Sequence, residues 1–346
     1  MTVKPLSRYA QLRAILTREG ARWGTFVLAV VGAAGVVQYY RPPATIGLAP
    51  FVASRRTALP RAEPALNAFG KSGAVQMRFA LPGESVHYPL QVRDNPSELS
   101  YSWVRLTDGA LADSVRALTG ASIRAPQEPG MYQLALENGG LRRVLQGVTV
   151  AVLVPFEEKR GSDIEGYRIG TFLAERLGSS EKERPAGFVK ISESDAQLPI
   201  TKHLRLGDFL TRDGQTQWPR YAAISPLVLD KLELVVASIA ELRGGDARVR
   251  VELNVHSAFR TPAYNGYNRF SRDSRHQYGD AIDVAIDANG DGRLSASDTW
   301  LVARAVDRVE EENPELMGGM GVYTSEKYNQ PYVHIDARGK KARWRG

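Results

Sequence analysis

The sequence lacks cysteine entirely: none of its 346 residues carries a thiol. Disulfide bonds and a lipid anchor attached through cysteine are therefore excluded. Histidine is scarce, with five in the whole chain, so two of them in matching motifs are informative. The apolar stretch at residues 23–37 is short and glycine-rich for a complete membrane span, but its aromatic flanks bring it near the needed length. At this length we expect two or three domains with enough material for a buried core.

The N-terminal segment combines positive charge with that apolar stretch. Tyr39 and Tyr40 close the stretch, and the basic residues before it are Lys4, Arg8, Arg13, Arg18 and Arg22. This pattern is typical of a signal peptide or signal anchor. Because no clean cleavage site of small residues follows, we predict that residues 1–41 are a cytoplasmic basic segment and an uncleaved anchor in the inner membrane. A cleaved signal peptide is the alternative, and either would place the remaining chain in the periplasm.

Two changes of pattern follow the apolar stretch. Residues 42–72 contain several prolines and arginines and are expected to be a linker. Residues 73–156 show short alternating strands separated by turn signals, which predicts an all-β sandwich of the immunoglobulin-like type. Within them, Pro129-Gly130-Met131-Tyr132 resembles the corner before a late strand of such a domain. No chemistry is evident in this part.

The last part of the chain is expected to be an α+β domain at residues 221–346. Residues 157–220 contain strand and turn pieces, which we attach to that domain as a connecting segment. Ser225-Pro226 is expected to start a helix. In the strand at residues 280–286, Ile282, Val284 and Ile286 fall on one face and Asp283 falls on the other.

His276, Asp283 and His334 are the most informative residues in the chain. Asp283 and His334 lie on alternating strands whose other faces are apolar, and His276 lies seven residues before Asp283. Two imidazoles and one carboxylate leave the fourth tetrahedral position of a zinc ion open for water, as in catalytic sites. The pattern therefore predicts a catalytic zinc site. The alternative is that both histidines are ordinary polar residues near a sheet edge.

Four motifs in order resemble those of the zinc D-Ala-D-Ala carboxypeptidase and murein endopeptidase family, in the hedgehog/D,D-peptidase superfamily. They lie at residues 257–265, 274–283, 318–323 and 333–339, with Trp344 just beyond, so the resemblance covers about residues 220–346. It implies an α+β catalytic domain of the hedgehog/D,D-peptidase type. It also implies that His276, Asp283 and His334 are zinc ligands and that the protein hydrolyses peptide bonds of peptidoglycan stem peptides.

The resemblance assigns roles to three more residues. Arg260 matches the arginine that faces the scissile carbonyl or a substrate carboxylate, both of which need a fixed bidentate cation. Ser274 and Tyr323 fall at substrate-binding positions, although Ser274 could equally stabilise a turn. Arg260 could instead form a surface ion pair.

One position departs from the pattern of the family. Several relatives carry the general base as an acidic residue three positions before the last histidine, and here that position is Pro331, which cannot accept a proton. We expect Asp336, on the same strand face as His334, to act as the catalytic base in its place. His256 and Asp280 are weaker candidates.

A second metal site is predicted between the two halves of the zinc site. Residues 287–298 fit a twelve-residue calcium loop, with glycine at position six and an acid at position twelve. The expected ligands are Asp287, Asn289, Asp291, the Arg293 carbonyl, Ser295 through water, and Asp298. The last acid is Asp rather than the usual Glu, which suggests weaker ligation. The alternative is a polar turn without an ion.

These observations lead to one main functional hypothesis and two others. The main one is a zinc metallopeptidase that acts on peptidoglycan, as a carboxypeptidase or as an endopeptidase. A mild basic excess, a net charge of +7, suits this anionic polymer, and nucleic acid is not indicated. The second hypothesis is a non-catalytic peptidoglycan-binding or scaffold protein that keeps the zinc fold, as Pro331 permits. The third is a calcium-dependent adhesion protein whose working part is the sandwich.

Overall fold

The computed structural model describes residues 29–31, 36–38, 59–120, 122–178, 183–244, 251–324 and 330–346. The chain forms two compact units, Met1–Arg56 and Thr57–Gly346. In the first unit, β1 (Ala29–Val31) and β2 (Val36–Gln38) pair antiparallel. The predicted basic segment and membrane anchor otherwise lie outside the described residues, as does the predicted linker up to residue 58. No helix within the described ranges has the length and apolar character needed to cross a bilayer.

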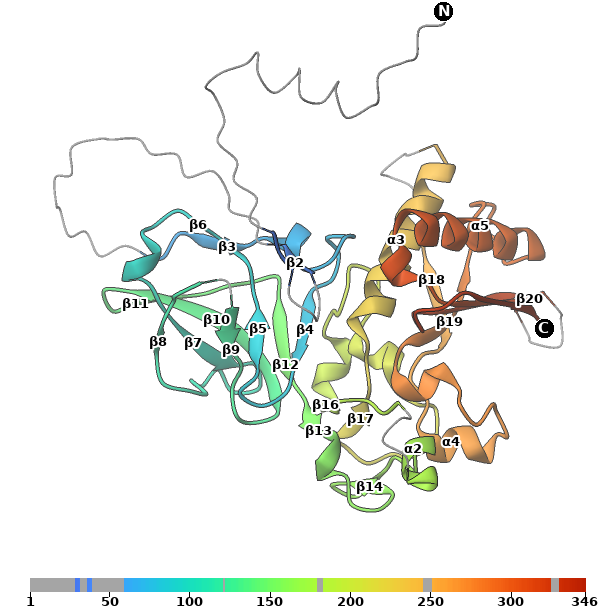
Figure 1. The fold of residues 1–346 in the computed structure, drawn as a ribbon, viewed down its shortest axis with the longest axis horizontal. Coiled ribbons are helices and arrows are strands. Elements are labelled where there is room, and N and C mark those ends of the chain that lie inside the picture. The colour runs from blue at the N-terminus through green and yellow to red at the C-terminus, as the bar shows by residue number, and fades with distance from the viewer. Residues whose placement is uncertain are drawn as a thin grey trace, which may run out of the picture. The chain divides into compact units, whose positions relative to one another are not determined.

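The N-terminal half of the second unit is built almost entirely of strands (Figure 1). Its main sheet has the order β4-β12-β10-β7-β8, with β11 paired to β10, and two further pairs are β3-β6 and β5-β9. β12 and β4 run parallel, whereas the other neighbours run antiparallel. The elements are β3 (Ala62–Pro64), η1 (Leu66–Ala68), β4 (Met77–Ala80), β5 (Ser85–His87), β6 (Leu90–Val92), η2 (Pro96–Glu98), β7 (Ser100–Arg105), β8 (Arg116–Ala117), β9 (Ser122–Arg124), β10 (Gly130–Asn138), β11 (Leu141–Val144) and β12 (Thr149–Val152).

Two buried aromatic residues stabilise this β-rich half. Trp103 on β7 is 1% exposed, and its Nε1 donates to the Arg124 carbonyl at 2.7 Å. Tyr132 at the start of β10 donates its hydroxyl proton to the Glu128 carbonyl at 2.9 Å. This bond closes the corner that the sequence predicts, and such a tyrosine corner is a hallmark of immunoglobulin-like sandwiches. That class remains our proposal for this half.

The linker predicted at residues 42–72 is too long at its C-terminal end. Ala62 on β3 and Phe69 are both buried in the core of the β-rich half, and the Phe69 ring packs edge-on against Tyr88 at 5.2 Å. Residues 70–72 are also fixed, because the Asp230 carboxylate accepts the backbone N–H groups of Lys71 and Ser72 at 2.9 Å each. The strand β3 has only three residues, so the sequence pattern did not reveal it.

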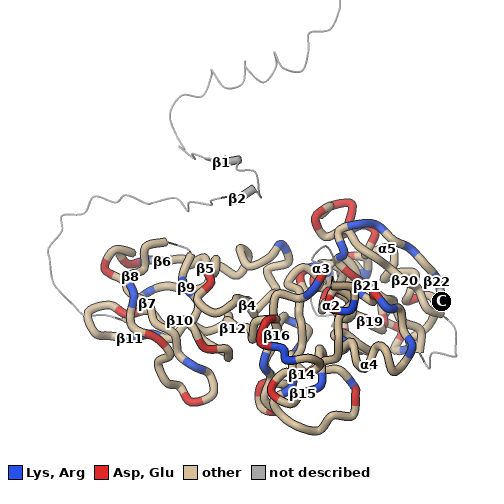
Figure 2. The backbone as a smooth tube through the Cα atoms, turned by 60° about the horizontal axis from the view of Figure 1, so that its bottom comes forward, with Lys and Arg blue, Asp and Glu red and all other residues tan. Residues whose placement is uncertain are grey.

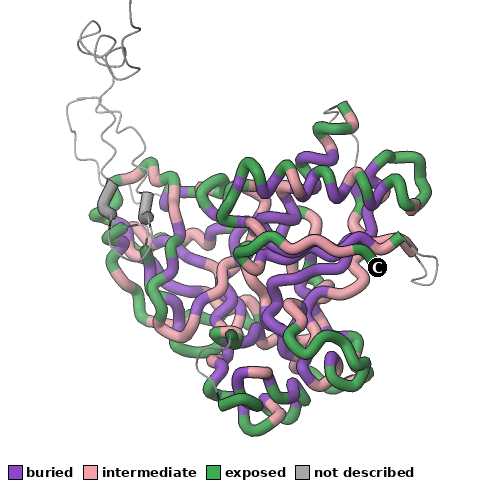
Figure 3. The backbone as a smooth tube through the Cα atoms, turned by 45° about the vertical axis from the view of Figure 1, so that its right-hand side comes forward, coloured by how far each residue is buried: buried purple, intermediate pink, exposed green. Residues whose placement is uncertain are grey.

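The main sheet carries a hydrophobic core on each face. Tyr132, Leu134 and Val150 belong to the core that β5 and β9 cover. Met77, Met131 and Ala151 alternate with them and belong to a second core, which continues into the rest of the chain. Figure 3 shows the buried residues running through the interior, while the exposed ones gather in loops and at ends.

The connecting segment packs against the C-terminal domain, as expected. Its elements are β13 (Val154–Pro155), η3 (Phe156–Glu158), β14 (Asp163–Ile164), β15 (Tyr167–Arg168), α2 (Leu173–Leu177), β16 (Gly187–Ile191), η4 (Ser194–Gln197), η5 (Leu206–Phe209) and β17 (Arg220–Ala222), with β13, β16 and β17 in one sheet. The Thr211 hydroxyl donates to the Phe259 carbonyl at 3.1 Å and accepts from the Thr261 N–H at 3.0 Å. The segment is thereby fixed beside the arginine motif.

The C-terminal domain is a five-stranded sheet with the order β18-β19-β21-β20-β22. Figure 1 shows α3 and α5 together on one side of this sheet and α4 on the other. Ser225 caps α3, with Pro226 at its first position, as predicted. The elements are α3 (Pro226–Leu242), β18 (Leu253–Ser257), α4 (Pro262–Tyr267), η6 (Arg275–Tyr278), β19 (Ala281–Ile286), α5 (Ala296–Glu312), η7 (Pro314–Leu316), β20 (Gly319–Tyr323), β21 (Tyr332–Asp336) and β22 (Ala342–Arg345).

Charged residues of both signs are interspersed along the described backbone (Figure 2). Many of them pair across elements, as Arg343 on β22 does with Asp307 on α5 at 2.7 Å. Such exposed or half-exposed pairs contribute little to stability individually. The pairs that matter for function are the buried ones beside the C-terminal sheet.

Candidate metal centre

Five residues form a straight row across the five strands of the C-terminal sheet. Ser257 is in register with Asp283, Asp283 with His334, His334 with Gly321, and Gly321 with Trp344. The opposite faces of β19 and β21 carry apolar side chains that belong to the core beneath α3 and α5. The alternation predicted for these two strands is therefore confirmed, and it places the polar row on the face away from the helices.

His276 reaches this row from the short helix η6. The Gly279 that ends η6 has φ +71°, and a Cβ there would overlap the Ala223 carbonyl oxygen, so only glycine fits. The Arg260 N–H donates to the His276 carbonyl at 3.1 Å. The turn and this bond fix the imidazole above β19 and β21.

The three predicted ligands are brought together. His276 Nε2 lies 3.1 Å from His334 Nδ1 and 3.2 Å from Asp283 Oδ1. The distance between His334 Nδ1 and Asp283 Oδ1 is 2.8 Å. A zinc ion with tetrahedral bonds of about 2.0–2.1 Å holds its donors about 3.3 Å apart. The triangle therefore fits one ion of that size. Among the described residues, no other group of three His, Asp or Glu gathers in this way.

The second nitrogen of each imidazole fixes which nitrogen can bind a cation. His276 Nδ1 lies 2.5 Å from the Ala258 carbonyl oxygen, and His334 Nε2 lies 3.1 Å from Asp336 Oδ2. Both partners only accept, so both nitrogens carry protons. When both rings are neutral, the lone pairs of His276 Nε2 and His334 Nδ1 therefore face the Asp283 oxygen. Three acceptors at this spacing repel one another unless a proton or a metal cation lies between them.

The triad favours a neutral ring at His276 and a positive charge at His334. Burial lowers the pKa of His276, against the opposing effect of Asp283, which keeps its imidazole neutral. Burial also acts against the charged form of His334, but its bonds to Asp283 and Asp336 raise its pKa. The pKa of Asp283 lies well below its usual value, because the two histidines outweigh the opposing effect of burial. A permanent carboxylate charge is thus available.

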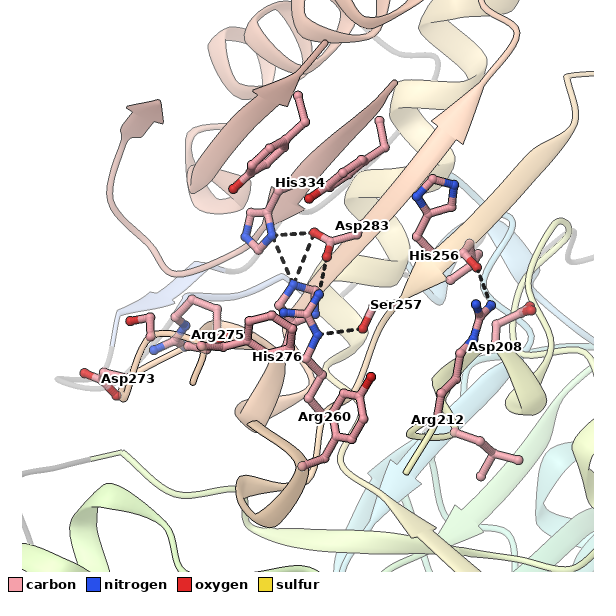
Figure 4. A pocket seen from close by; sticks show the side chains of 18 of the residues that line it. Asp208, Arg212, His256, Ser257, Arg260, Asp273, Arg275, His276, Asp283 and His334 are labelled. Atoms are coloured by element: carbon pink, nitrogen blue, oxygen red, sulfur yellow. Dashed lines mark hydrogen bonds and ion pairs between the residues drawn. The ribbon is translucent and has the colours of Figure 1, made fainter. Parts of the chain in front are cut away.

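The triad opens into a cleft of about 830 Å³ (Figure 4). Arg260 lies beside it, with its Nη2 on Asp283 Oδ2 and its Nε on the Ser257 hydroxyl at 2.7 Å. The Phe270 ring covers the guanidinium at 4.6 Å. Arg260 is therefore held beside Asp283 and not in a surface ion pair, and its role toward a substrate stays a prediction.

The two other expected substrate-binding residues also line the cleft. Ser274 precedes η6, and its hydroxyl makes no cap hydrogen bond there. Tyr323 stacks on Tyr332 with ring centres 4.5 Å apart, and its hydroxyl accepts from Trp344 Nε1 at 2.9 Å. These rings form an aromatic wall next to His334.

Asp336 does not lie where the predicted catalytic base would have to lie. The residue is fully buried and does not line the cleft. Its carboxylate binds His334 Nε2 on one side and the Arg338 guanidinium on the other, and these partners lower its pKa despite burial. Asp336 thus orients a ligand from behind, and a carboxylate with so low a pKa is a poor proton acceptor.

The two weaker candidates for the base differ in position. Asp280 is buried and is bound by the Arg275 guanidinium through both carboxylate oxygens. His256, by contrast, lies at the bulge of β18 and lines the cleft, with its ring 5.3 Å from that of Tyr332. Of the candidates named from the sequence, only His256 faces the space beside the triad.

Sequence reasoning missed part of the cleft wall. Asp208 and Arg212, from the connecting segment, line the cleft opposite Asp273 and Arg275 (Figure 4). Arg212 Nη2 donates to the Val255 carbonyl at 3.0 Å, which fixes the segment beside β18. No motif marks these residues, because their position depends on packing between distant parts of the chain.

The predicted calcium loop lies between β19 and α5. Asp287 accepts from the Gly290 and Gly292 N–H groups, and Asp298 accepts from the Asn289 and Ser295 N–H groups. The Arg243 guanidinium donates to the Asp287 and Ala288 carbonyls. The carboxylates of the loop do not form a cluster of the kind seen at His276. Calcium binding by the six residues therefore stays a prediction.

Comparisons with known proteins give no relative. No protein-family model matches the chain, no curated protein matches it, and no solved structure matches its fold.

Proposed function

We propose that the protein is a zinc metallopeptidase that hydrolyses peptide bonds of peptidoglycan stem peptides or cross-links. The observation that carries the proposal is the triangle of His276 Nε2, Asp283 Oδ1 and His334 Nδ1 at the floor of a cleft, with separations of 2.8–3.2 Å. Two histidines and one carboxylate form a ligand set of catalytic zinc sites. The motif resemblance supplies the substrate class.

The residues around the triad have roles in this reaction. Bound zinc supplies Lewis-acid chemistry, because it activates water near neutral pH and polarises a carbonyl. Arg260 stabilises the negative charge that develops on the carbonyl oxygen, since its guanidinium is already fixed beside Asp283. His256 takes up the proton released by water, because it is the titratable candidate that lines the cleft. Asp336 keeps His334 in the ligating tautomer.

The cleft also suits an anionic peptide. Arg212, Arg260, Arg275 and Arg338 all line it. Arg260, Arg275 and Arg338 also bond carboxylates of the protein, whereas Arg212 bonds the Val255 carbonyl, so Arg212 is the first candidate to bind a substrate carboxylate. Stem peptides carry free carboxylates at their ends. With the predicted anchor at residues 1–41, the enzyme would work in the periplasm, next to its polymer.

Digestion of purified muropeptides tests the proposal. The full chain, loaded with zinc, is expected to release peptide products that mass spectrometry identifies, and the masses will distinguish a carboxypeptidase from an endopeptidase. The His276→Ala variant should release none. His87→Ala is the matched control, because His87 is exposed on β5 and lies outside the cluster. The absence of products from the zinc-loaded parent would refute the peptidase.

One observation favours a second function, a non-catalytic peptidoglycan-binding protein. Pro331 stands where several members of the family that the motifs resemble carry an acidic base, and Asp336, its expected substitute, is buried behind His334. In that case the parent and His256→Ala should both bind cell-wall fragments and release no products. Products from the parent that His256→Ala fails to make would exclude this alternative.

A further inference from the structure

A buried ion pair lies behind the metal centre, between α3 and α5. Lys231 is fully buried and Glu310 is 3% exposed, and Lys231 Nζ lies 2.7 Å from Glu310 Oε1. Because burying two charges costs desolvation energy, such a pair adds little stability by itself, and apolar residues often replace it without loss. Neither residue lines the cleft. The position of the pair therefore needs another explanation.

Both members of the pair bind the backbone around Asp336. Lys231 Nζ also donates to the Asp336 carbonyl at 2.7 Å. Glu310 Oε1 also accepts from the Gly318 N–H at 3.0 Å, and the next N–H, of Gly319, donates to Asp336 Oδ1 at 2.7 Å. The pair thus fixes the main chain of Asp336 and, through one residue, the donor that orients its carboxylate.

The glycines permit this close approach. A Cβ on Gly318 would overlap the Asp336 carbonyl oxygen, and a Cβ on Gly319 would overlap Asp336 Oδ2. Only glycine at both positions lets the strand that starts at residue 319 lie directly against Asp336. The contacts of the ion pair and the two glycines therefore converge on one carboxylate, which in turn bonds His334 Nε2 at 3.1 Å.

We propose that Lys231 and Glu310 are positioning residues for the metal ligand His334 and act on it through Asp336. The proposal rests on the metal site proposed above and goes beyond it, because neither residue touches substrate or metal. Outer partners of a ligating histidine fix its tautomer and ring orientation, and removing them weakens metal binding. Here Lys231 on α3 and Glu310 on α5 lie one step further out, because they contact Asp336 and its neighbours but not His334.

Zinc affinity of the full chain tests this role. The Lys231→Met/Glu310→Gln variant removes both charges and nearly keeps the shapes. It also weakens the bond of Arg343 to Glu310 Oε2, while Arg343 retains its bond to Asp307. We expect its zinc dissociation constant, measured by competition with a chromogenic chelator, to rise about tenfold. The matched control is Lys159→Met/Glu175→Gln, another pair with a buried lysine, at 2.6 Å. That variant should bind zinc like the parent.

A second comparison separates positioning from general packing. In an Asp336→Asn background, Lys231→Met/Glu310→Gln should weaken zinc binding by much less than tenfold, because residues that act through a shared partner are not additive. The proposal is overturned if the double substitution lowers zinc affinity as much in the Asp336→Asn background as in the parent. An equal loss of zinc affinity in the Lys159/Glu175 control also overturns it. If the double variant does not fold, Glu310→Gln alone serves, and an unchanged zinc affinity then overturns it.

The result is independent of catalysis. If the zinc-loaded parent protein cleaves no muropeptide, the peptidase function is refuted but the positioning role is not. Unchanged zinc affinity in the double variant removes the positioning role and leaves the peptidase intact.

Discussion

The indole of Trp344 lies over the imidazole of His334, with ring centres 5.1 Å apart and planes at 49°. Gly321 makes this contact possible, because it lies between the two residues in the sheet register and a Cβ there would overlap the indole nitrogen. Trp344 thereby covers one side of a proposed metal ligand, while its Nε1 donates to Tyr323. The row across the sheet thus shapes the cleft and carries two of the three proposed ligands, Asp283 and His334.

Gly321→Ala should displace the indole from His334. We expect a loss of about 1–3 kcal/mol in the free energy of unfolding, as for other overpacked sites, together with weaker zinc binding. Chemical denaturation and chelator competition measure the two effects. Gly266→Ala is the control, since nothing lies within 4 Å of its added Cβ and alanine favours the helix. Equal stability of the two variants would contradict the overlap.

Removing the metal should lower the melting temperature. A ligand at one hundred times its dissociation constant stabilises the folded state by about 2.7 kcal/mol, so zinc should raise the melting temperature of chelator-treated protein. His276→Ala should lose this response and His87→Ala should keep it. Scanning calorimetry with and without zinc measures both. A zinc response that persists in His276→Ala would place the site elsewhere.

The Asp336→Asn variant tests whether Asp336 orients His334 or acts as the catalytic base. Because Asp336 supports His334 from behind, we expect zinc affinity to fall about 10–100-fold and activity to recover largely when zinc is in excess. A base would behave differently: its loss would abolish turnover at saturating zinc and leave affinity unchanged. Kinetics at several zinc concentrations distinguish the two outcomes.

Arg260→Lys should reduce turnover more than substrate binding. Lysine cannot bond both Asp283 and Ser257 with a planar fork, so the cation loses its fixed place. If Arg260 stabilises the developing oxyanion, kcat should fall about 10²–10³-fold. Arg212→Lys is the comparison, because Arg212 lines the cleft without bonding a zinc ligand. A similar kcat for Arg260→Lys and the parent would remove the assigned role.

Calcium should raise the melting temperature if residues 287–298 bind it. Asp291→Ala removes one expected ligand and should abolish the rise. Without calcium its stability should change little, because Asp291 is exposed and bonds only within the loop. Asp298→Ala is unsuitable as a test, since Asp298 also caps α5. If calorimetry finds no calcium-dependent rise in the melting temperature of the parent, residues 287–298 are a polar turn that binds no calcium.

Much of the metal centre could be predicted because its signals are local. Strand alternation gave the faces of Asp283 and His334, and the register then brought them together. The same alternation placed Asp336 on the face of His334, which is correct, but alternation does not say whether a side chain is covered. Arg338 and the Gly319 N–H enclose this carboxylate, and both depend on tertiary packing.

The cleft wall and the domain borders were harder to predict. Asp208 reaches the cleft only because Thr211 and Arg212 bond backbone groups some fifty and forty residues further along the chain. Phe69 looked like part of a linker because the short segment around it, between prolines and glycines, shows no clear helical or strand period. Such long-range contacts leave no trace in a local pattern.

The double-sided packing of the β4-β12-β10 sheet has a practical consequence for anyone who divides the chain at residue 156. Met77, Met131 and Ala151 would become exposed to water on one fragment, and residues of the same core beyond residue 156 would become exposed on the other. Both pieces would tend to aggregate, so a failure of either to bind or cleave cell wall would say nothing about where the activity resides. Point substitutions in the intact chain avoid this ambiguity.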